Sequence, residues 1–133
     1  MASEHHEFAT VAELARAFDS PRRLRLDRAA VAVWAAVAHW DPLAQRAAVH
    51  DPGRPAPMLA VDMSDAGPAH HLRVGDALLL HGELATLDGC PLLLRASLVL
   101  PAAGMDYAAY VTTRTALRSM MRGTFGRGLP WDP

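Results

Sequence analysis

The sequence predicts an all-β domain with helices, in which a five-stranded barrel lies between a short N-terminal helix and an amphipathic C-terminal helix. Several short segments have the apolar patterns of β-strands, and turn residues such as Asp41-Pro42 and Asp88-Gly89 separate them. The 133 residues fit one domain, and 51% hydrophobic with 20% charged residues is typical of a globular protein. We therefore expect one core, formed by residues 10–122.

The N-terminal region is predicted to contain one helix. Residues 1–9 are expected to form a polar tail. Thr10 is the predicted N-cap of the helix, and Glu13 completes a capping box with it. The apolar pattern continues to Phe18, and the helix is expected to end before Pro21.

The segment 24–40 allows two interpretations. Its alanines favour a helix, whereas Val31, Val33 and Val37 recur at the even spacing of a strand. We predict a strand. Because the segment is apolar on both sides after Ala29, a strand of this length has to bend and contribute to two parts of a barrel.

Four further strands are predicted, and the strand number and order indicate a small barrel, with the oligonucleotide-binding (OB) barrel of five strands as its model. They comprise residues 46–50, 58–63, 76–87 and 91–100. The connection at 64–71 is predicted to have helical content, because an OB barrel usually places a helix between its third and fourth strands. Asp88-Gly89 tolerates positive φ, which suits a tight turn between the last two strands.

The C-terminal helix is predicted to span residues 106–122, with a tail at 123–133. Asp106 is the expected N-cap, and Gly123 ends the helix. At about 100° per residue, the apolar side chains form a main strip and a weaker second strip, which indicates one contact with the barrel and another with a partner.

Arginines lie in or beside the main apolar strip of this helix, at positions 114 and 118, with a third at 122. Interfaces between proteins are enriched in arginine, which favours a partner-binding surface. The alternative is that these side chains extend past an ordinary core helix into solvent.

The sequence contains no recognisable catalytic or metal-binding motif. GxSxG, Walker A and GxGxxG sequences are absent, so we expect no enzymatic activity and no cofactor. The His5-His6 and His70-His71 pairs lack the spacing of a zinc-binding helix, and Cys90 is the sole cysteine, so no metal site is expected. The longest apolar stretch, at 29–38, is about half of the roughly 20 residues that a membrane helix needs, so no membrane contact is expected.

Composition argues against tight binding of nucleic acid by this chain alone. Its net charge is −1, whereas proteins that bind phosphate backbones usually carry an excess of positive charge. A weak contact with single-stranded DNA remains compatible with an OB barrel, whose second and third strands form the usual binding face. The candidate residues for this contact are Arg25, Trp40, Arg46 and Arg54.

Four short motifs occur between about residues 31 and 122. In chain order they are Trp40-Asp41, Val74-Gly75-Asp76, Gly82-Glu83-Leu84 and Gly104-Met105-Asp106. Their order and spacing resemble the Ten-one family, which provides the smallest OB-fold subunit of the telomere-capping CST complex. The sequence departs from the family at Ala35, where a glycine is frequent. The smallest subunit of replication protein A is similar in its barrel-plus-helix plan.

The resemblance implies a non-catalytic subunit that binds a Stn-like OB-fold subunit through its C-terminal helix. It also implies a larger CST subunit and DNA polymerase alpha-primase as further partners, single-stranded telomeric DNA held mainly by the complex, and location in the nucleus at telomeric chromosome ends. The function would be support of telomere capping and C-strand synthesis. The partner-binding residues would be Tyr107, Tyr110, Val111, Arg114, Leu117, Arg118, Met120 and Met121.

Two other hypotheses remain open from the sequence. One is a subunit like the smallest subunit of replication protein A, or a stand-alone OB module that binds single-stranded nucleic acid by itself. The other is a small enzyme, which would need a polar pocket with perturbed titratable groups.

Overall fold

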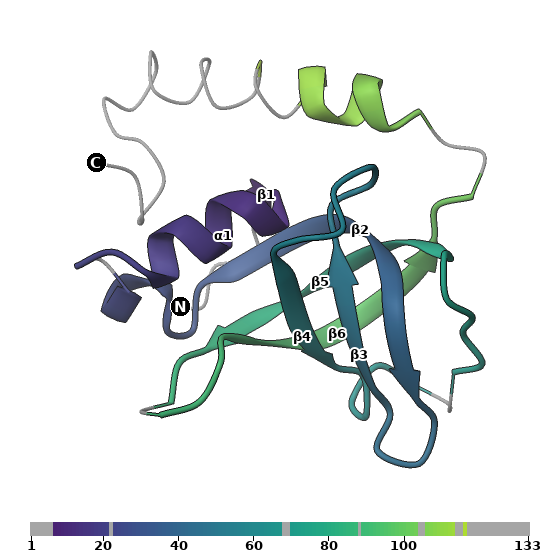
Figure 1. Ribbon diagram of the computed structural model, residues 1–133, viewed down its shortest axis with the longest axis horizontal. Helices are drawn as coiled ribbons and strands as arrows, with labels where there is room; N and C mark the ends of the chain where they lie inside the picture. The colour runs from purple at the N-terminus through teal and green to yellow at the C-terminus, as the bar shows by residue number, and fades with distance from the viewer. Residues whose placement is uncertain are drawn as a thin grey trace.

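The computed structural model describes residues 7–21, 23–67, 70–87, 89–103, 106–113 and 116. Its elements are strand β1 (Glu7–Ala9), helix α1 (Val11–Phe18), 3₁₀-helix η1 (Arg23–Leu26), strands β2 (Ala30–Asp41), β3 (Arg46–His50), β4 (Met58–Asp62), β5 (Ala77–Ala85) and β6 (Leu93–Pro101), and a C-terminal helix at residues 107–113 (Figure 1).

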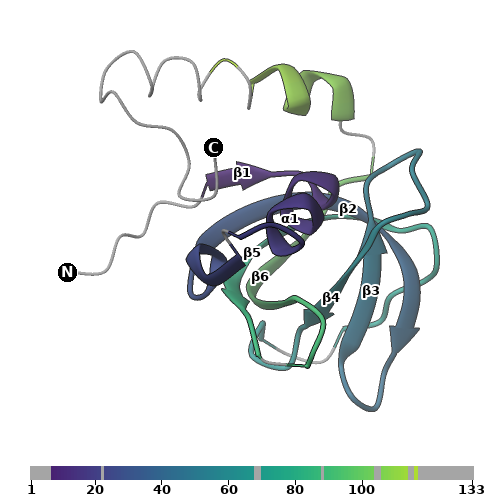
Figure 2. The same cartoon turned by 60° about the vertical axis from the view of Figure 1, so that its left-hand side comes forward.

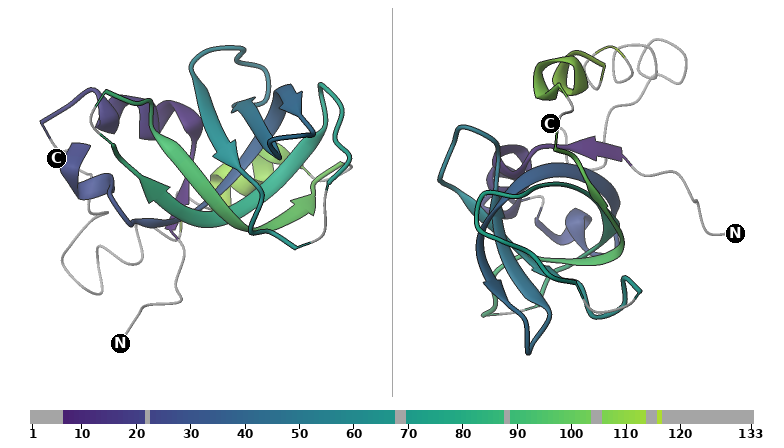
Figure 3. Two further views of the ribbon diagram at one scale, coloured as in Figure 1. Left: turned by 90° about the horizontal axis from the view of Figure 1, so that it is seen from below. Right: turned by 90° about the vertical axis from the view of Figure 1, so that its right-hand side faces the viewer.

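Strands β2 to β6 form a closed barrel. The sheet order is β1-β2-β3-β4-β6-β5, and additional pairing of β2 with β5 closes it. The β4–β6 pair is parallel, and the other barrel pairs are antiparallel. This arrangement confirms the predicted OB barrel, and the right-hand view of Figure 3 shows the strands surrounding one interior.

Strand β2 bends and belongs to two parts of the barrel, as the sequence predicts. Its first half, from Ala30 to Ala36, pairs with β5, and its second half pairs with β3 as far as Asp41. The register shifts between Val37 and His39, which marks a β-bulge. The strand begins at Ala30 rather than at residue 24.

The residues before β2 form η1 instead of the predicted start of the strand. In a 3₁₀-helix three residues complete a turn, so the alternating leucines point in different directions. Leu26 is fully buried, whereas Leu24 is 77% exposed. An alternating sequence at 23–27 therefore contributes one leucine to the core and does not extend the sheet.

The core fills the barrel with aliphatic side chains, and α1 covers one end together with η1 (Figure 2). Helix α1 contributes Val11 and Leu14, both buried. Its N-terminus has the predicted capping box, because the Glu13 N–H donates to Thr10 Oγ1 at 3.2 Å and the Thr10 N–H donates to Glu13 Oε1 at 2.9 Å. The fully buried barrel residues include Val31, Val33, Val37, Val49, Val61, Leu80, Leu84 and Leu94.

The predicted polar tail is wrong at its last three residues, because Glu7–Ala9 form β1. This strand pairs in parallel with β2, with Phe8 opposite Ala32 and Ala9 opposite Val33. Ala9 is fully buried. Three residues are too few for a periodic signal in the sequence, and the strand forms because the edge of β2 offers it backbone partners.

The connection between β4 and β5 has no helix in its described residues, 63–67 and 70–76, which contradicts the expected helical content. Gly67 has φ +92°, which an α-helix does not accept. Gln45 fixes the connection instead: its backbone oxygen accepts from the Met63 N–H at 2.8 Å, and its Oε1 accepts from the His70 N–H at 2.9 Å.

Gly82 allows β5 and β6 to cross closely. A Cβ at this position would lie against the backbone oxygen of Arg95 and 2.8 Å from the Cα of Ala96. The register of the two strands shifts between His81 and Gly82. Gly82 in the Gly-Glu-Leu motif is therefore a structural residue of the barrel.

Candidate partner-binding helix

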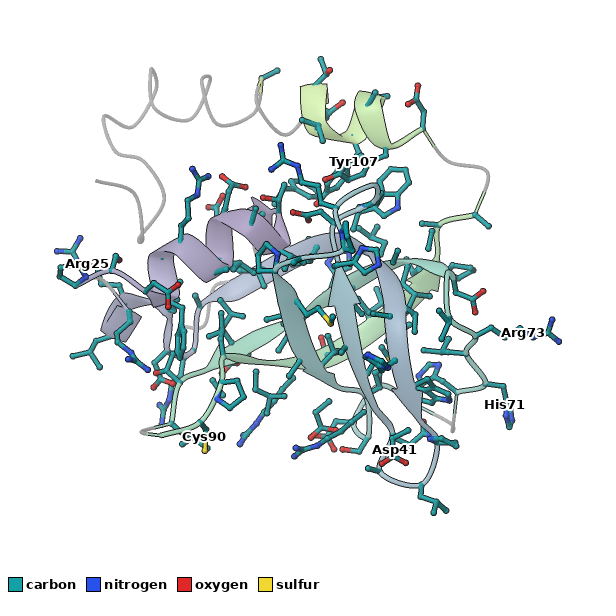
Figure 4. All side chains as sticks on the ribbon, in the orientation of Figure 1. Arg25, Asp41, His71, Arg73, Cys90 and Tyr107 are labelled. Carbon is teal, nitrogen blue, oxygen red and sulfur yellow. The ribbon has the colours of Figure 1, made fainter. Side chains whose placement is uncertain are left out.

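The C-terminal helix lies against the outside of β1 and β2 through an aromatic cluster, which we define as Phe8, Trp34, Tyr107 and Tyr110. The Trp34 ring is 5.2 Å from each tyrosine ring, centroid to centroid, and both contacts are edge-on. Phe8 is 5.6 Å from Tyr110, and the two tyrosine rings are stacked at 6.0 Å. Figure 4 shows Tyr107 directed from the helix toward the barrel.

Hydrogen bonds fix both the start of this helix and its position on the barrel. Asp106 Oδ1 accepts from the backbone N–H groups of Ala108 at 3.0 Å and Ala109 at 3.3 Å, which confirms the predicted N-cap. The Tyr110 hydroxyl donates to the backbone oxygen of Ala32 at 3.2 Å. Trp34 is 3% exposed beneath the helix.

In the described part of the helix, residues 107–113 and 116, the opposite side does not pack on the barrel. Ala109 and Ala116 are both exposed and lie about two turns apart on one side. Tyr107, Tyr110 and Val111 are half-buried, as expected for residues at the seam with the barrel. Of the two contacts predicted for this helix, the contact with the barrel is formed by the aromatic cluster.

Three of the eight predicted partner-binding residues are described: Tyr107, Tyr110 and Val111. The structure places both tyrosines against their own barrel, and their contact with a partner stays a prediction. The other five predicted residues lie outside the described part of the chain. These are Arg114, Leu117, Arg118, Met120 and Met121.

The four predicted nucleic-acid residues do not form one cluster. Trp40 pairs with buried Ala47, whereas Arg46 pairs with Asp41, so the two side chains lie on opposite faces of the sheet. Trp40 packs on the core. The β-bulge explains why Trp40 faces inward. Before the bulge the inward-facing residues of β2 have odd numbers, as Val37 does, and after it they have even numbers.

The two remaining arginines of this set are exposed but lie on different parts of the molecule. Arg25 belongs to η1, and Arg54 belongs to the loop between β3 and β4. Figure 4 shows Arg25 and Asp41, the partner of Arg46 in the sheet register, at different ends of the molecule. Binding of nucleic acid by the four residues stays a prediction.

The outer face of β3 and β4 combines positive and negative groups. Asp62 is opposite Arg46 in the β3–β4 register and opposite Arg95 in the β4–β6 register. Hydrogen bonds from the Ser64 N–H at 3.0 Å and Ser64 hydroxyl at 2.7 Å lower the pKa of Asp62, and the two arginines lower it further. The charged carboxylate offsets positive charge that would otherwise attract phosphate.

Two interactions of structural importance were missed by sequence reasoning. Asp51, which is 4% exposed, accepts hydrogen bonds from the Val11 N–H at 2.8 Å and the Ala12 N–H at 3.0 Å, and so caps α1 from a distant loop. The Asp27 carboxylate accepts from the Thr86 N–H at 3.0 Å, which lowers the pKa of Asp27 and joins the end of η1 to the β5–β6 loop. Neither pair has a local sequence signal.

Within the described residues, no group of three or more His, Cys, Asp or Glu side chains could hold a metal ion. Helices in that part of the chain are also too short or too polar to cross a membrane. Cys90 is exposed as a free thiol.

No protein-family model matches the sequence, and no curated protein sequence is significantly similar to it. Several solved structures are similar in fold to this chain. A chain of the S. pombe Stn1–Ten1 complex matches with a TM-score of 0.63 and 13% identity, over 89% of this chain and 96% of that one. The S. pombe telomere capping protein Ten1 matches with a TM-score of 0.62 and 12% identity, over 86% of this chain and 99% of that one. At such low identity the similarity establishes a shared fold, which is an OB barrel with flanking helices.

Proposed function

We propose that this chain is the smallest, non-catalytic OB-fold subunit of a telomeric CST-like complex and that it binds a Stn-like OB-fold subunit through its C-terminal helix. The observation that carries the proposal is the helix itself. It is held on the barrel by Trp34, Tyr107 and Tyr110, and it presents another side that the barrel does not cover. The similarity in fold to Ten1 and to the Stn1–Ten1 complex supports this proposal.

The outward side of the helix is suited to another helix. Ala109 and Ala116 are small, so a partner backbone can approach closely and pack side chains between them. In the sequence, Met120 continues the same side at helical spacing, and Arg114, Leu117, Arg118 and Met121 continue the side of the tyrosines. We propose that the partner contacts both strips beyond the aromatic cluster, with Tyr107, Tyr110 and Val111 at its edge.

The remaining functions belong to the assembly in this proposal. Single-stranded telomeric DNA is held mainly by the Stn-like and larger CST subunits, at chromosome ends in the nucleus, and the complex works with DNA polymerase alpha-primase in C-strand synthesis. Two features support a minor part for this chain: Trp40 packs on the core, and Asp62 offsets the charge of Arg46 and Arg95.

The test is co-purification of the partner with two matched variants. Ala109→Glu/Ala116→Glu places two carboxylates on the outward side of the helix, where burial of unpaired charge against a partner costs several kcal/mol. Leu43→Glu/Ala44→Glu adds the same charge to the exposed β2–β3 turn.

We expect the helix variant to lose the Stn-like subunit and the turn variant to retain it, with equal thermal stability of both barrels. Retention of the partner by the helix variant at normal yield would contradict binding through this surface.

A further inference from the structure

A cleft of about 570 Å³ lies between the connection that precedes β5 and the C-terminal end of β6. This volume is in the range of natural ligand sites, which is roughly 300–1,000 Å³. The cleft exists beside a connection that contains no helix in its described residues, at the position where an OB barrel usually has one. Its walls are mainly apolar and include Leu72, Ala77, Leu78, Val99, Pro101 and Ala103.

Two residues of the cleft lining, Val99 and Pro101, belong to an open strand edge. The Ala102 N–H donates to the Ala77 oxygen at 2.8 Å, which fixes the alternation of hydrogen bonds between β5 and β6. By this alternation, Val99 and Pro101 direct their backbone groups away from β5.

The edge is open because β4 pairs with β6 only at residues 93–95, before Val99 is reached. Among the described residues, no backbone group bonds to the Val99 N–H, the Val99 oxygen or the Pro101 oxygen. One donor and two acceptors of these two lining residues therefore face away from β5 in the spacing of an extended chain.

One cationic side chain, that of Arg73, stands beside the rim of the cleft. Arg73 lies between the cleft residues Leu72 and Gly75, it is exposed, and its side chain extends outward (Figure 4). His70 and His71 are also on this side. The one carboxylate in the lining, Asp76, accepts from the Arg73 backbone N–H at 2.9 Å through Oδ2.

We propose that this cleft binds an extended peptide segment of a partner protein, which adds as a short strand to the edge of β6. The segment places one apolar side chain between Leu72 and Val99 and a carboxylate near Arg73. Recognition through main-chain hydrogen bonds, with a pocket for alternate side chains, is how exposed strand edges bind peptides. The site is separate from the outward side of the C-terminal helix, so it does not depend on the function proposed above.

The test is an NMR titration of the ¹⁵N-labelled full chain with the peptide acetyl-Asp-Val-Leu-Val-Thr-amide. We expect saturable shifts of the amides at 72–78, 99, 100, 102 and 103, with a Kd of about 1 mM or tighter. The same peptide with N-methylated valines should not bind, because it lacks the N–H donors for the Val99 and Pro101 oxygens.

Two variants and a control test the position of the site. Ala103→Trp fills the cleft and should abolish the shifts, and Arg73→Glu should weaken binding by roughly tenfold. Leu43 lies in the β2–β3 turn and is 97% exposed, so the control variant Leu43→Trp should bind the peptide normally. The proposal is overturned if no shifts occur at about 1 mM peptide, if the N-methylated peptide binds equally, or if Ala103→Trp and Arg73→Glu both bind as the control does.

Discussion

The Tyr110 hydroxyl donates a hydrogen bond to the backbone oxygen of Ala32, which lies 78 residues earlier in the sequence, and so joins the C-terminal helix to β2. The same ring contacts both Trp34 and Phe8. This hydrogen bond lies inside an apolar contact and helps to fix the helix on the barrel, so the outward side of the helix faces away from the barrel in a defined direction.

Tyr110→Phe removes this hydrogen bond and leaves the aromatic contacts in place. A bond of this kind contributes about 0.5–1.5 kcal/mol, so the helix should separate from the barrel more often while the barrel stays folded. Hydrogen exchange should become faster at residues 107–113 and unchanged in β3 and β4. Equal acceleration in the barrel strands would show that the helix and barrel unfold as one unit.

Asp51→Ala removes the distant cap of α1. The variant leaves the Val11 and Ala12 N–H groups without their acceptor at a buried site, which should lower the free energy of unfolding by about 1–3 kcal/mol. Urea denaturation measures this loss. Asp65→Ala, at an exposed turn, is the matched control and should change stability by less than about 0.5 kcal/mol.

Gly82→Ala tests the close crossing of β5 and β6. The added methyl group would contact the backbone of Arg95 and Ala96, which cannot move away as a flexible side chain would. We expect a loss of about 2–3 kcal/mol in the free energy of unfolding, in the range found for overpacked cores. Glu83→Ala, at the exposed neighbouring position, should lower the free energy of unfolding far less. If Gly82→Ala lowers it as little as Glu83→Ala does, the two strands can move apart at this point.

Asp62 should make stability depend on pH in the acidic range. Its folded-state pKa is lowered by Ser64, Arg46 and Arg95, so its contribution is fully present above the unfolded pKa of about 4 and is lost as pH falls through the folded pKa. Asp62→Asn should therefore reduce the fall in stability on acidification below about pH 4. Thermal denaturation across that range should show the difference, and an unchanged pH profile would exclude Asp62 as a contributor.

Much of the fold follows from local sequence patterns. The strand at 46–50 has the predicted bounds, Thr10 and Asp106 cap the predicted helices, and the long apolar segment ending at Trp40 is a bent strand. These features depend on residues that are close to one another in the sequence, so local sequence patterns predict them.

The errors have a different physical origin. The β-bulge in β2 reverses which side chains face inward, and it turns Trp40 away from Arg46 although the sequence places both near one turn. Strand β1 and the cap formed by Asp51 depend on partners far away in the chain. The barrel contact of Tyr107 and Tyr110 required the position of Trp34, which the helix periodicity alone does not supply.

The proposed function requires that the C-terminal helix binds a second OB-fold subunit. The most direct measurement is mass spectrometry of the tagged chain purified from its native source under gentle conditions. We predict a stoichiometric Stn-like OB-fold protein in the wild-type sample and its loss in Ala109→Glu/Ala116→Glu. If the wild-type chain purifies alone, or if the partner remains bound to this variant, the helix is not the surface that binds a second OB-fold subunit.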